Sequence, residues 1–309
     1  MIDKHIIIHK KYKFIWMACT IGLLASFTAS AEAVLLAPDA YMDIKEQCCL
    51  VDVRDAQAFL TERLPGSVWL ASTAFDDDDS TATKKLAAPE AITAMLSERG
   101  FSQDMHIVLY GANSNAGDVI AVTHVFWVLE YLGYNKVSIL DGGLSRWKAE
   151  DRATVSEPPD ALPPATVMQK PDTANKRADI EQVKQAMASD NTALVDARPR
   201  NQYNGAVPIR GLQRKGHIPG AYNIPYFLVT AMPHATFKSV EDLKETLYPK
   251  GITADSSIIT YCNIGRSSSV LYFAYRRIGH EKITHYDGGM VEWSANTTLP
   301  VSTDVPESN

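Results

Sequence analysis

Short apolar runs alternate with amphipathic stretches along most of this 309-residue chain. The pattern is clearest in the second half. The elements expected there are a helix at 179–188, a strand at 193–197, a helix at 239–248, a strand at 257–261, a helix at 266–278, a strand at 282–286 and a helix at 290–295. Strands that alternate with helices predict an α/β fold, with a parallel sheet flanked by helices on both faces. Ligands of such folds bind at the carboxyl ends of the strands.

The second signal is self-similarity, because four short blocks occur twice in the same order. The paired blocks are 50–54 with 194–198, 64–67 with 218–221, 107–111 with 258–262, and 141–147 with 287–293. Four ordered repeats indicate a duplicated domain, which we expect to span 38–151 and then 176–303. The segment between the copies, 152–175, holds five prolines and is predicted to be an extended linker that crosses the outside of both domains.

The first 31 residues do not fit this pattern. Four lysines precede an apolar stretch at 14–27, and Ala29-Ser30-Ala31 supplies small residues at both cleavage subsites. These features are typical of a secretory signal peptide and predict export to a periplasm, with no stable membrane association after cleavage. An uncleaved anchor is one alternative, although the apolar stretch is short for a bilayer span. A lipoprotein modified at Cys19 is the other, although Cys19 lies inside the apolar stretch.

The composition is that of an ordinary globular protein. Apolar residues make up 46% of the chain and charged residues 21%, and the length suggests two domains. Cleavage after residue 31 removes four lysines and one aspartate, which leaves 26 basic and 35 acidic side chains and a formal charge of −9. No basic patch is visible in the sequence, so nucleic acid is not an expected partner.

Cysteines and histidines narrow the candidate chemistry. Cys48, Cys49 and Cys262 remain after cleavage, and an odd number in an exported protein points to a free reactive thiol or an intermolecular bridge. Cys48 and Cys49 precede a strand and are expected to be half-buried; a vicinal disulfide or a redox relay is the alternative. The histidines have no metal-ligand spacing, so no metal or other cofactor is predicted. The acidic run 76–79 lacks the spacing of a calcium loop and is expected to be solvated.

Cys262 is the strongest candidate for a catalytic residue. It ends an apolar run of strand length and opens a short loop that contains Gly265 and leads into a helix. A thiol there lies under unpaired backbone N–H groups and at the positive end of a helix dipole, and both stabilise a thiolate. Arg266 adds a positive charge. A buried cysteine used as a small hydrophobe is the alternative, but Gly265 and Arg266 favour a reactive thiol.

These motifs resemble the rhodanese superfamily in its two-domain sulfurtransferase form. The motifs are Asp-Ala-Arg at 196–198, Gly-His-Ile-Pro-Gly-Ala at 216–221, the Cys262 loop, and Asp-Gly-Gly at 287–289 with Trp293. The resemblance covers roughly residues 40–300. It implies two tandem rhodanese-like domains, of which the first is catalytically silent and the second carries a persulfide-forming cysteine. Gly111 stands in the first copy where the second has Cys262.

The mechanism implied by the resemblance is double displacement. The Cys262 thiolate takes the outer sulfur of a donor such as thiosulfate, and sulfite leaves. A thiophilic acceptor, cyanide or a thiol, then removes the sulfur from the persulfide. The partners expected are therefore a small-molecule sulfur donor and an acceptor. The expected substrate-binding residues are Asn263, Ile264, Gly265, Arg266, Ser267, Ser268 and Arg198.

Each residue of the loop is expected to have its own role. Backbone N–H groups from Asn263 to Ser268 stabilise negative charge on the sulfur, as in other anion-binding nests. Gly265 permits a turn that a side chain would obstruct. Arg266 attracts the anionic donor. The hydroxyls of Ser267 and Ser268 donate hydrogen bonds and cap the following helix.

The residues outside the loop are expected to serve mainly as scaffold. Arg198 either contacts the ligand or forms a buried ion pair with Asp196 that holds the strand end, and the ion pair is favoured. His217, with the turn at 219–220, and Tyr261 are expected in the scaffold and the core.

Two departures from the family pattern bear on the donor. Thiosulfate-specific members often carry basic residues directly after the cysteine and an Arg ahead of the Tyr-x-Gly of the first strand–helix loop; here Asn263, Ile264 and Gln202 stand in those places. Mercaptopyruvate-specific members usually show Gly-Ser-Gly-Val-Thr after the cysteine, and that is absent too. Thiosulfate is the donor we expect, with 3-mercaptopyruvate or another sulfane donor as alternatives.

Two further functions are alternatives to a sulfurtransferase. A phosphatase of the same superfamily needs an Arg six residues after the cysteine, to enclose a tetrahedral phosphate. Here Arg266 is at plus four and Ser268 at plus six, which disfavours that function. A persulfide carrier that hands sulfur to a periplasmic partner would use the same cysteine, so the sequence leaves it open.

Overall fold

The computed structural model describes residues 34–77, 85–157, 162, 165 and 176–304. The expected signal peptide lies outside the described residues, and so does most of the linker. Among the described residues, none of the helices has the length and apolar character needed to cross a membrane.

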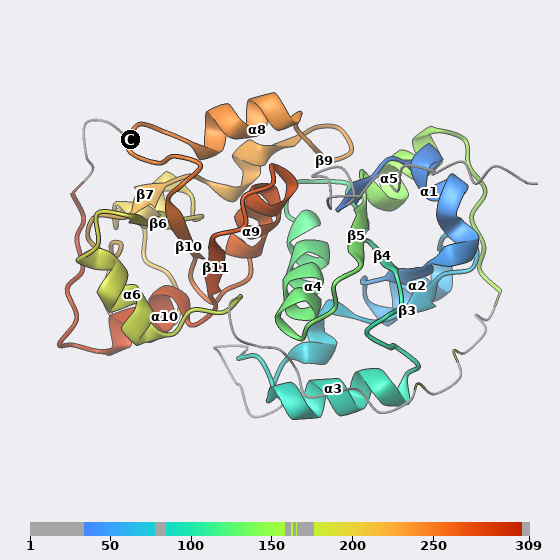
Figure 1. The fold of residues 1–309 in the computed structure, drawn as a ribbon, viewed down its shortest axis with the longest axis horizontal. Helices are drawn as coiled ribbons and strands as arrows, with labels where there is room; N and C mark the ends of the chain where they lie inside the picture. The colour runs from blue at the N-terminus through green and yellow to red at the C-terminus, as the bar shows by residue number, and fades with distance from the viewer. Residues whose placement is uncertain (1–33, 78–84, 158–161, 163–164, 166–175, 305–309) are drawn as a thin grey trace, which may run out of the picture.

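Two parallel sheets carry the fold (Figure 1). The first has the order β1-β5-β4-β2-β3, formed by Leu35–Leu36, Val137–Leu140, Ile107–Tyr110, Cys49–Asp52 and Val68–Trp69. The second has the order β11-β10-β6-β7, formed by Ile283–Tyr286, Ser257–Tyr261, Thr192–Asp196 and Tyr222–Asn223. At the free edge of β11, Arg177 forms a parallel bridge with His285. This bridge corresponds in position to β1, which pairs with β5 at the edge of the first sheet. The two sheets therefore share one strand order.

Helices cover both faces of each sheet, as the alternating pattern predicts. The first domain has α1 (Pro38–Ile44), α2 (Ala56–Thr61), α3 (Pro89–Glu98), α4 (Val119–Tyr131) and α5 (Gly143–Ala149). The second has α6 (Ile180–Met187), α7 (Arg200–Tyr203), α8 (Val240–Leu247), α9 (Ser268–Arg277) and α10 (Gly289–Ala295). The smaller elements are the 3₁₀ turns η1 (Lys45–Gln47), η2 (Ser72–Phe75) and η3 (Tyr226–Val229) and the antiparallel strands β8 (Thr230–Ala231) and β9 (Thr236–Phe237). The predicted α/β class with two tandem units is confirmed.

Alternate side chains of each strand enter different layers of the core, because successive residues of a strand point to opposite faces. In β4, Ile107 and Leu109 pack in the cluster that includes α3 and α4. Val108 and Tyr110 pack in the cluster that includes α1 and α5. The side chains of β10 divide in the same way between α8 with α9 and α6 with α10.

The two domains share one apolar core where α4 packs along α9 (Figure 1). Phe126 and Phe273 meet edge to face, with ring centroids 4.9 Å apart. Glu130 accepts a hydrogen bond from the Tyr272 hydroxyl at 2.7 Å and pairs with Arg276 at 3.1 Å. A continuous apolar interface of this kind holds the two domains in one relative position.

The element bounds predicted for the second domain agree with the structure to within a few residues. β10 has the predicted bounds. α6 begins with the predicted capping box, in which the Asp179 carboxylate accepts the Gln182 N–H at 2.8 Å and the Gln182 side chain accepts the Asp179 N–H at 2.9 Å. α9 begins at Ser268, two residues later than expected, and the loop before it includes Gly265 with a φ of +70°, outside the helical region.

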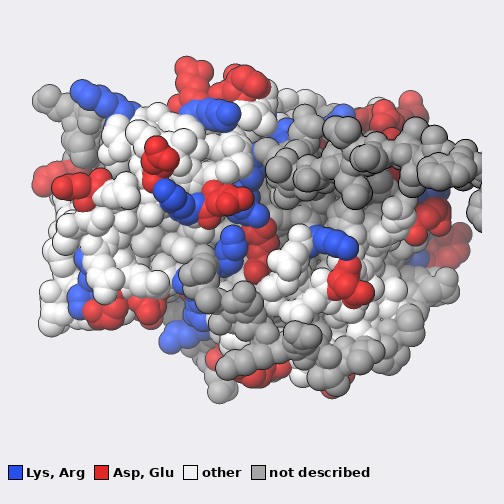
Figure 2. Space-filling model, viewed as in Figure 1, with Lys and Arg blue, Asp and Glu red and all other residues white. Residues whose placement is uncertain are grey.

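The described part of the linker lies against the first domain. Val155 pairs with Arg63 in an antiparallel bridge, and the Ala165 N–H donates to the Ser97 carbonyl at 3.0 Å. The expected passage over the second domain falls mainly on 166–175, outside the described residues. On the face shown in Figure 2, the acidic and basic side chains of the described residues are interspersed and form no continuous basic surface.

Cys48 and Cys49 lie at the start of β2, and both side chains are half-buried, as predicted. Both thiols are free, so the structure does not contain the vicinal disulfide that was the alternative. Burial raises the pKa of the Cys49 thiol to about 11, which keeps this thiol protonated at neutral pH.

Candidate active site

Cys262 follows β10 directly, at the carboxyl end of the second sheet, and is 2% exposed. Its carbonyl accepts a hydrogen bond from the Met290 N–H at 2.8 Å, and the Asn263 carbonyl accepts one from the Val291 N–H at 3.0 Å. A Cβ at Gly289 would lie 2.6 Å from both carbonyl oxygens, so only glycine permits this approach. The first turn of α10 thus fixes the backbone on which the thiol stands.

The loop from Cys262 to α9 presents a row of unused N–H groups. Within the described part of the chain, none of the backbone N–H groups from Asn263 to Ser268 donates a hydrogen bond to another group of the protein. Gly265 lies so close to the next loop that a Cβ there would be 2.5 Å from the Asp287 Cα. Its carbonyl accepts a hydrogen bond from His285 Nε2 at 2.9 Å. Free N–H groups in a tight loop before a helix are typical of an anion-binding nest.

The corresponding loop of the first domain begins in the same way, but its own Asp118 carboxylate accepts two of its backbone N–H groups. Gly111 stands in place of Cys262, and its carbonyl accepts the Leu144 N–H at 3.0 Å, matching the bond from Met290 in the second domain. The Asp118 carboxylate then accepts the N–H groups of Ser114 at 2.7 Å and Asn115 at 3.3 Å. The first domain fills its loop with its own carboxylate, whereas the loop of the second domain has no such internal anion among the described residues.

The serines at the start of α9 do not cap this helix, contrary to the prediction. Ser267 is the N-cap residue, but its side chain makes no capping bond, because its backbone is already helical (φ −67°, ψ −22°) rather than extended. Instead, the Ser269 hydroxyl donates to the Arg266 carbonyl at 2.7 Å. The Ser268 hydroxyl is wholly buried and has no hydrogen-bond partner among the described residues. A buried hydroxyl of this kind remains available to a ligand.

Arg198 forms the buried ion pair that the sequence favoured. Its guanidinium lies 2.6 Å from the Asp196 carboxylate and also donates to the Gly216 carbonyl at 2.8 Å. Burial acts to lower the pKa of Arg198, but the Asp196 carboxylate outweighs it, so the pKa rises and the residue stays charged. Cys262 is among the groups whose negative form favours the charged guanidinium, which places Arg198 within electrostatic reach of the thiol.

Asn263 links the loop to this ion pair. Its Oδ1 accepts a hydrogen bond from Arg198 at 3.3 Å, and its Nδ2 donates to the Gln202 side chain at 2.9 Å. Ile264 is half-buried next to it. Gln202 stands where thiosulfate-specific members often have an arginine, and here its side chain holds Asn263 in place. Tyr261 is in the core, and its hydroxyl accepts the Ile218 N–H at 3.2 Å, as expected of scaffold.

Arg266 reaches across the domain interface. Its Nη2 donates to the carboxylate of Asp76, which follows η2 in the first domain. Burial lowers the pKa of Arg266 to about 10, against the pull of the Asp287 carboxylate, so the guanidinium remains charged at neutral pH. The expectation that the acidic run is solvated is wrong for Asp76, whose side chain is 16% exposed, because the folded interface supplies it with a cation.

Other residues at the loop were not expected from the sequence. His285, Ser269 and Asp76 each contact residues 265–266, and none belongs to a chemical motif. Ser269 is also bonded across the interface to Thr123 of α4 at 2.9 Å. From the sequence, His285 could be recognised only as a residue of the strand expected beside 257–261. Its contact with Gly265 could not be predicted.

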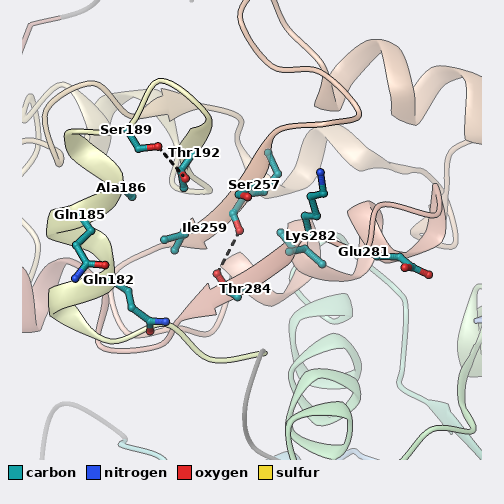
Figure 3. Close-up of a pocket in the computed structure, with 12 residues that line it drawn as sticks. Gln182, Gln185, Ala186, Ser189, Thr192, Ser257, Ile259, Glu281, Lys282 and Thr284 are labelled. Atoms are coloured by element: carbon teal, nitrogen blue, oxygen red, sulfur yellow. Dashed lines mark hydrogen bonds between the residues drawn. The ribbon is translucent and has the colours of Figure 1, made fainter.

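Cavities also lie away from the thiol. One of about 610 Å³ is at the amino end of β10, opposite to Cys262, and polar side chains of α6 and β11 line it, among them Gln182 and Thr284 (Figure 3). Another, of about 710 Å³, adjoins Asp287 and brings Lys85 of the first domain near Arg177. The position of a cysteine under free N–H groups, rather than cavity size, therefore identifies the site.

The arrangement can stabilise negative charge on sulfur. The loop offers N–H donors and a free hydroxyl, and charged guanidinium groups lie at Arg198 and Arg266. Such fixed donors are what a thiolate or a persulfide anion needs. Among the described residues, no cluster of His, Cys, Asp or Glu side chains has the arrangement of a metal site.

Comparisons with known proteins agree with this geometry. The Rhodanese-like domain family matches the chain twice, over residues 37–150 and 179–296. The "3-mercaptopyruvate sulfurtransferase" of Escherichia coli (strain K12) is 32% identical over 252 residues, covering 80% of this chain and 85% of that protein. A Haloferax volcanii protein named "Putative thiosulfate sulfurtransferase" is 33% identical over 257 residues, covering 81% of this chain and 86% of that protein.

A solved structure supports the fold independently. The crystal structure of YnjE superposes with a TM-score of 0.78 at 21% identity, covering 88% of this chain and 69% of that one. At 21% identity this similarity supports only the fold. The two family matches and the relatives above 30% identity support the sulfurtransferase activity. The chain therefore belongs to the rhodanese superfamily and is a two-domain sulfurtransferase of the rhodanese type.

Proposed function

We propose that the protein moves a sulfane sulfur from thiosulfate, through a persulfide on Cys262, to a thiophilic acceptor. The observation that carries this proposal is the contrast between the two loops. In the first domain Asp118 accepts the N–H groups of Ser114 and Asn115, whereas in the second none of the N–H groups from Asn263 to Ser268 has an acceptor among the described residues. Unused donors around a thiol favour an anion that forms during the reaction.

In the first step the Cys262 thiolate attacks the outer sulfur of thiosulfate. A bond forms between Sγ and that sulfur while the sulfur–sulfur bond of the donor breaks, and sulfite leaves with the bonding electron pair. The persulfide carries negative charge on its outer sulfur. The loop N–H groups and the free Ser268 hydroxyl are the groups that would stabilise it.

In the second step the acceptor removes the sulfur. Cyanide attacks the outer sulfur of the persulfide, thiocyanate leaves, and Cys262 returns as a thiolate. A thiol acceptor would react in the same way and leave as its own persulfide. The unused N–H groups of the loop are the donors that would stabilise the thiolate leaving group at the end of each cycle.

The identity of the sulfur donor is proposed on separate grounds. The relatives include proteins named for thiosulfate and for 3-mercaptopyruvate, and the loop of this chain has neither family's usual sequence after the cysteine. Thiosulfate is the donor proposed because Arg266, four residues after Cys262, can pair with an anionic donor in competition with the Asp76 carboxylate. Donor competition in one assay separates the two substrates.

We also propose that the protein works in the periplasm. This rests on the basic leader, the short apolar core and the Ala29-Ser30-Ala31 cleavage site. Amino-terminal sequencing of protein from a periplasmic extract should begin at Glu32. An intact Met1 recovered from the membrane fraction would contradict export with cleavage.

Thiocyanate formation from thiosulfate and cyanide tests the proposed function. Cys262→Ser should abolish it, because serine forms no persulfide. Cys48→Ser and Cys49→Ser are the matched controls and should keep it, since both thiols lie at the start of β2 in the first domain. Turnover that survives in Cys262→Ser would rule out Cys262 as the sulfur carrier.

A further inference from the structure

The ion pair between Asp76 and Arg266 places a resident carboxylate beside the catalytic loop. Asp76 belongs to the silent domain and Arg266 to the loop that holds Cys262, so the pair spans the interface. Both side chains are mostly buried, at 16% and 17% exposure. Because burial weakens screening by water and salt, this pair interacts more strongly than an exposed one.

Asp76 is held in this position by its backbone. It forms a bridge with Leu86, and its N–H donates to the Thr73 carbonyl at 3.2 Å. The preceding residue, Phe75, is wholly buried. The carboxylate is therefore carried by a fixed part of the backbone of the first domain.

The charges around Arg266 leave it little surplus for a ligand. Asp287, the residue that touches Gly265, also acts on the Arg266 guanidinium, although its nearest cation is Arg177 at 2.7 Å. Arg198, the cation with an electrostatic effect on Cys262, is bound to Asp196. An anionic donor that approaches Arg266 must therefore compete with a carboxylate that is already there.

We propose that Asp76 sets the donor specificity of the site, by competing with the donor for Arg266 and so disfavouring donors in proportion to their negative charge. This inference rests on the proposed function. The repulsion between a resident carboxylate and a dianion is twice that for a donor with one negative charge at the same distance. Thiosulfate should be penalised more than 3-mercaptopyruvate, which carries one carboxylate.

Asp76→Asn in the full chain tests this directly. Asparagine keeps the shape of the side chain and an oxygen that accepts from Arg266, but removes the charge. The KM for thiosulfate should fall by about tenfold, equivalent to about 1.4 kcal/mol, whereas the KM for 3-mercaptopyruvate should change much less.

Glu130→Gln is the matched control. Glu130 pairs with Arg276 and Tyr272 across the same interface but does not contact the loop. It should leave the ratio of the two KM values as in the wild type. If Asp76→Asn shifts both donors equally, or does no more than Glu130→Gln, Asp76 is a structural contact only and the inference is wrong.

A binding measurement keeps this test separate from the proposed reaction. Sulfate is an unreactive dianion, and its binding at the loop should protect Cys262 from alkylation by iodoacetamide. Asp76→Asn should lower the sulfate concentration needed for half protection by about the same tenfold factor, even if thiosulfate turns out not to be a donor. Unchanged protection in a folded Asp76→Asn protein would overturn the inference, whereas lack of turnover by the wild type would count only against the proposed function.

Discussion

His285 donates a hydrogen bond from Nε2 to the carbonyl of Gly265 at 2.9 Å, and its ring packs against Trp127 of the first domain, with centroids 4.5 Å apart. Its Nδ1 lies 3.1 Å from the Thr260 hydroxyl, which must donate to it because Nε2 carries the proton. One side chain thus connects the silent domain to the turn of the catalytic loop. Residue 285 is a positioning residue, since it acts on the loop and has no recorded contact with Cys262.

We predict that His285→Phe lowers kcat for sulfur transfer by about tenfold, equivalent to about 1.4 kcal/mol of lost transition-state stabilisation, with little change in KM. Phenylalanine retains the packing on Trp127 but cannot hold the Gly265 carbonyl. His285→Gln supplies an amide N–H in place of Nε2 and should recover part of kcat. Steady-state kinetics of both variants provide the check; equal losses in the two would show that the ring acts through packing alone.

Gly265→Ala should cost both stability and activity. A left-handed residue with a Cβ costs about 1–2 kcal/mol, and here the Cβ would also lie 2.5 Å from the Asp287 Cα, which adds roughly 1–3 kcal/mol of overpacking. Gly279→Ala is the control, because Gly279 has a φ of +80° but no atom of the described residues lies within 4 Å of the added Cβ. Urea unfolding should show the larger loss for Gly265→Ala, and only this variant should lose turnover. Equal losses would mean that the contact with Asp287 has no energetic effect.

The stability of the protein should fall as the pH drops below about 6.5. Burial lowers the pKa of His285 to about 4 and that of His124 to about 3, so the folded protein keeps both rings neutral where the unfolded chain takes up protons. Each ring therefore removes about 1.4 kcal/mol of stability per pH unit from about 6.5 down to its folded pKa, and its contribution is complete above 6.5.

His124→Phe isolates one of these contributions. Neither ring nitrogen of His124 has a hydrogen-bond partner among the described residues, so phenylalanine removes the titration without breaking a bond. Between pH 5 and pH 6.5 the free energy of unfolding should vary less steeply than in the wild type, by about 1.4 kcal/mol per pH unit. An unchanged slope in urea unfolding would show that His124 is not held neutral in the folded state.

Arg266→Ala should raise the KM for thiosulfate more than it lowers kcat, because the guanidinium attracts the donor by charge. The salt dependence of KM should also flatten, since the Debye length shortens from about 10 Å at 0.1 M to about 3 Å at 1 M and screens such attraction. Arg266→Lys should recover part of the affinity. Wild-type KM values for the alanine variant at every salt concentration would assign anion binding to the loop backbone alone.

The fold could be predicted because its determinants are local. Apolar runs, capping residues such as Asp179 and the four repeated blocks all lie within short stretches of sequence. The bounds of β10 follow from the run of apolar residues that ends before Cys262. The left-handed backbone of Gly265 could not be predicted, because it lies against Asp287 in a contact between two loops.

The site could be predicted only in part, for the same reason. Motifs in the sequence predicted Cys262 at the end of a strand and a buried ion pair between Asp196 and Arg198. The structure has both. The partner of Arg266 lies in the other domain, 190 positions earlier, where nothing local distinguishes Asp76 from the acids that follow it. Contacts across a domain interface depend on the relative position of two folded units, and sequence periodicity does not contain that information.

We propose above all that Cys262 carries the transferred sulfur. The intact mass of the purified protein, recorded before thiosulfate, after thiosulfate and then after cyanide, tests it most directly. We predict a gain of one sulfur atom with thiosulfate and its loss with cyanide, in the wild type and in Cys48→Ser and Cys49→Ser, but no gain in Cys262→Ser. A gain of sulfur in Cys262→Ser, or a wild type that takes up none from either thiosulfate or 3-mercaptopyruvate, would contradict the account.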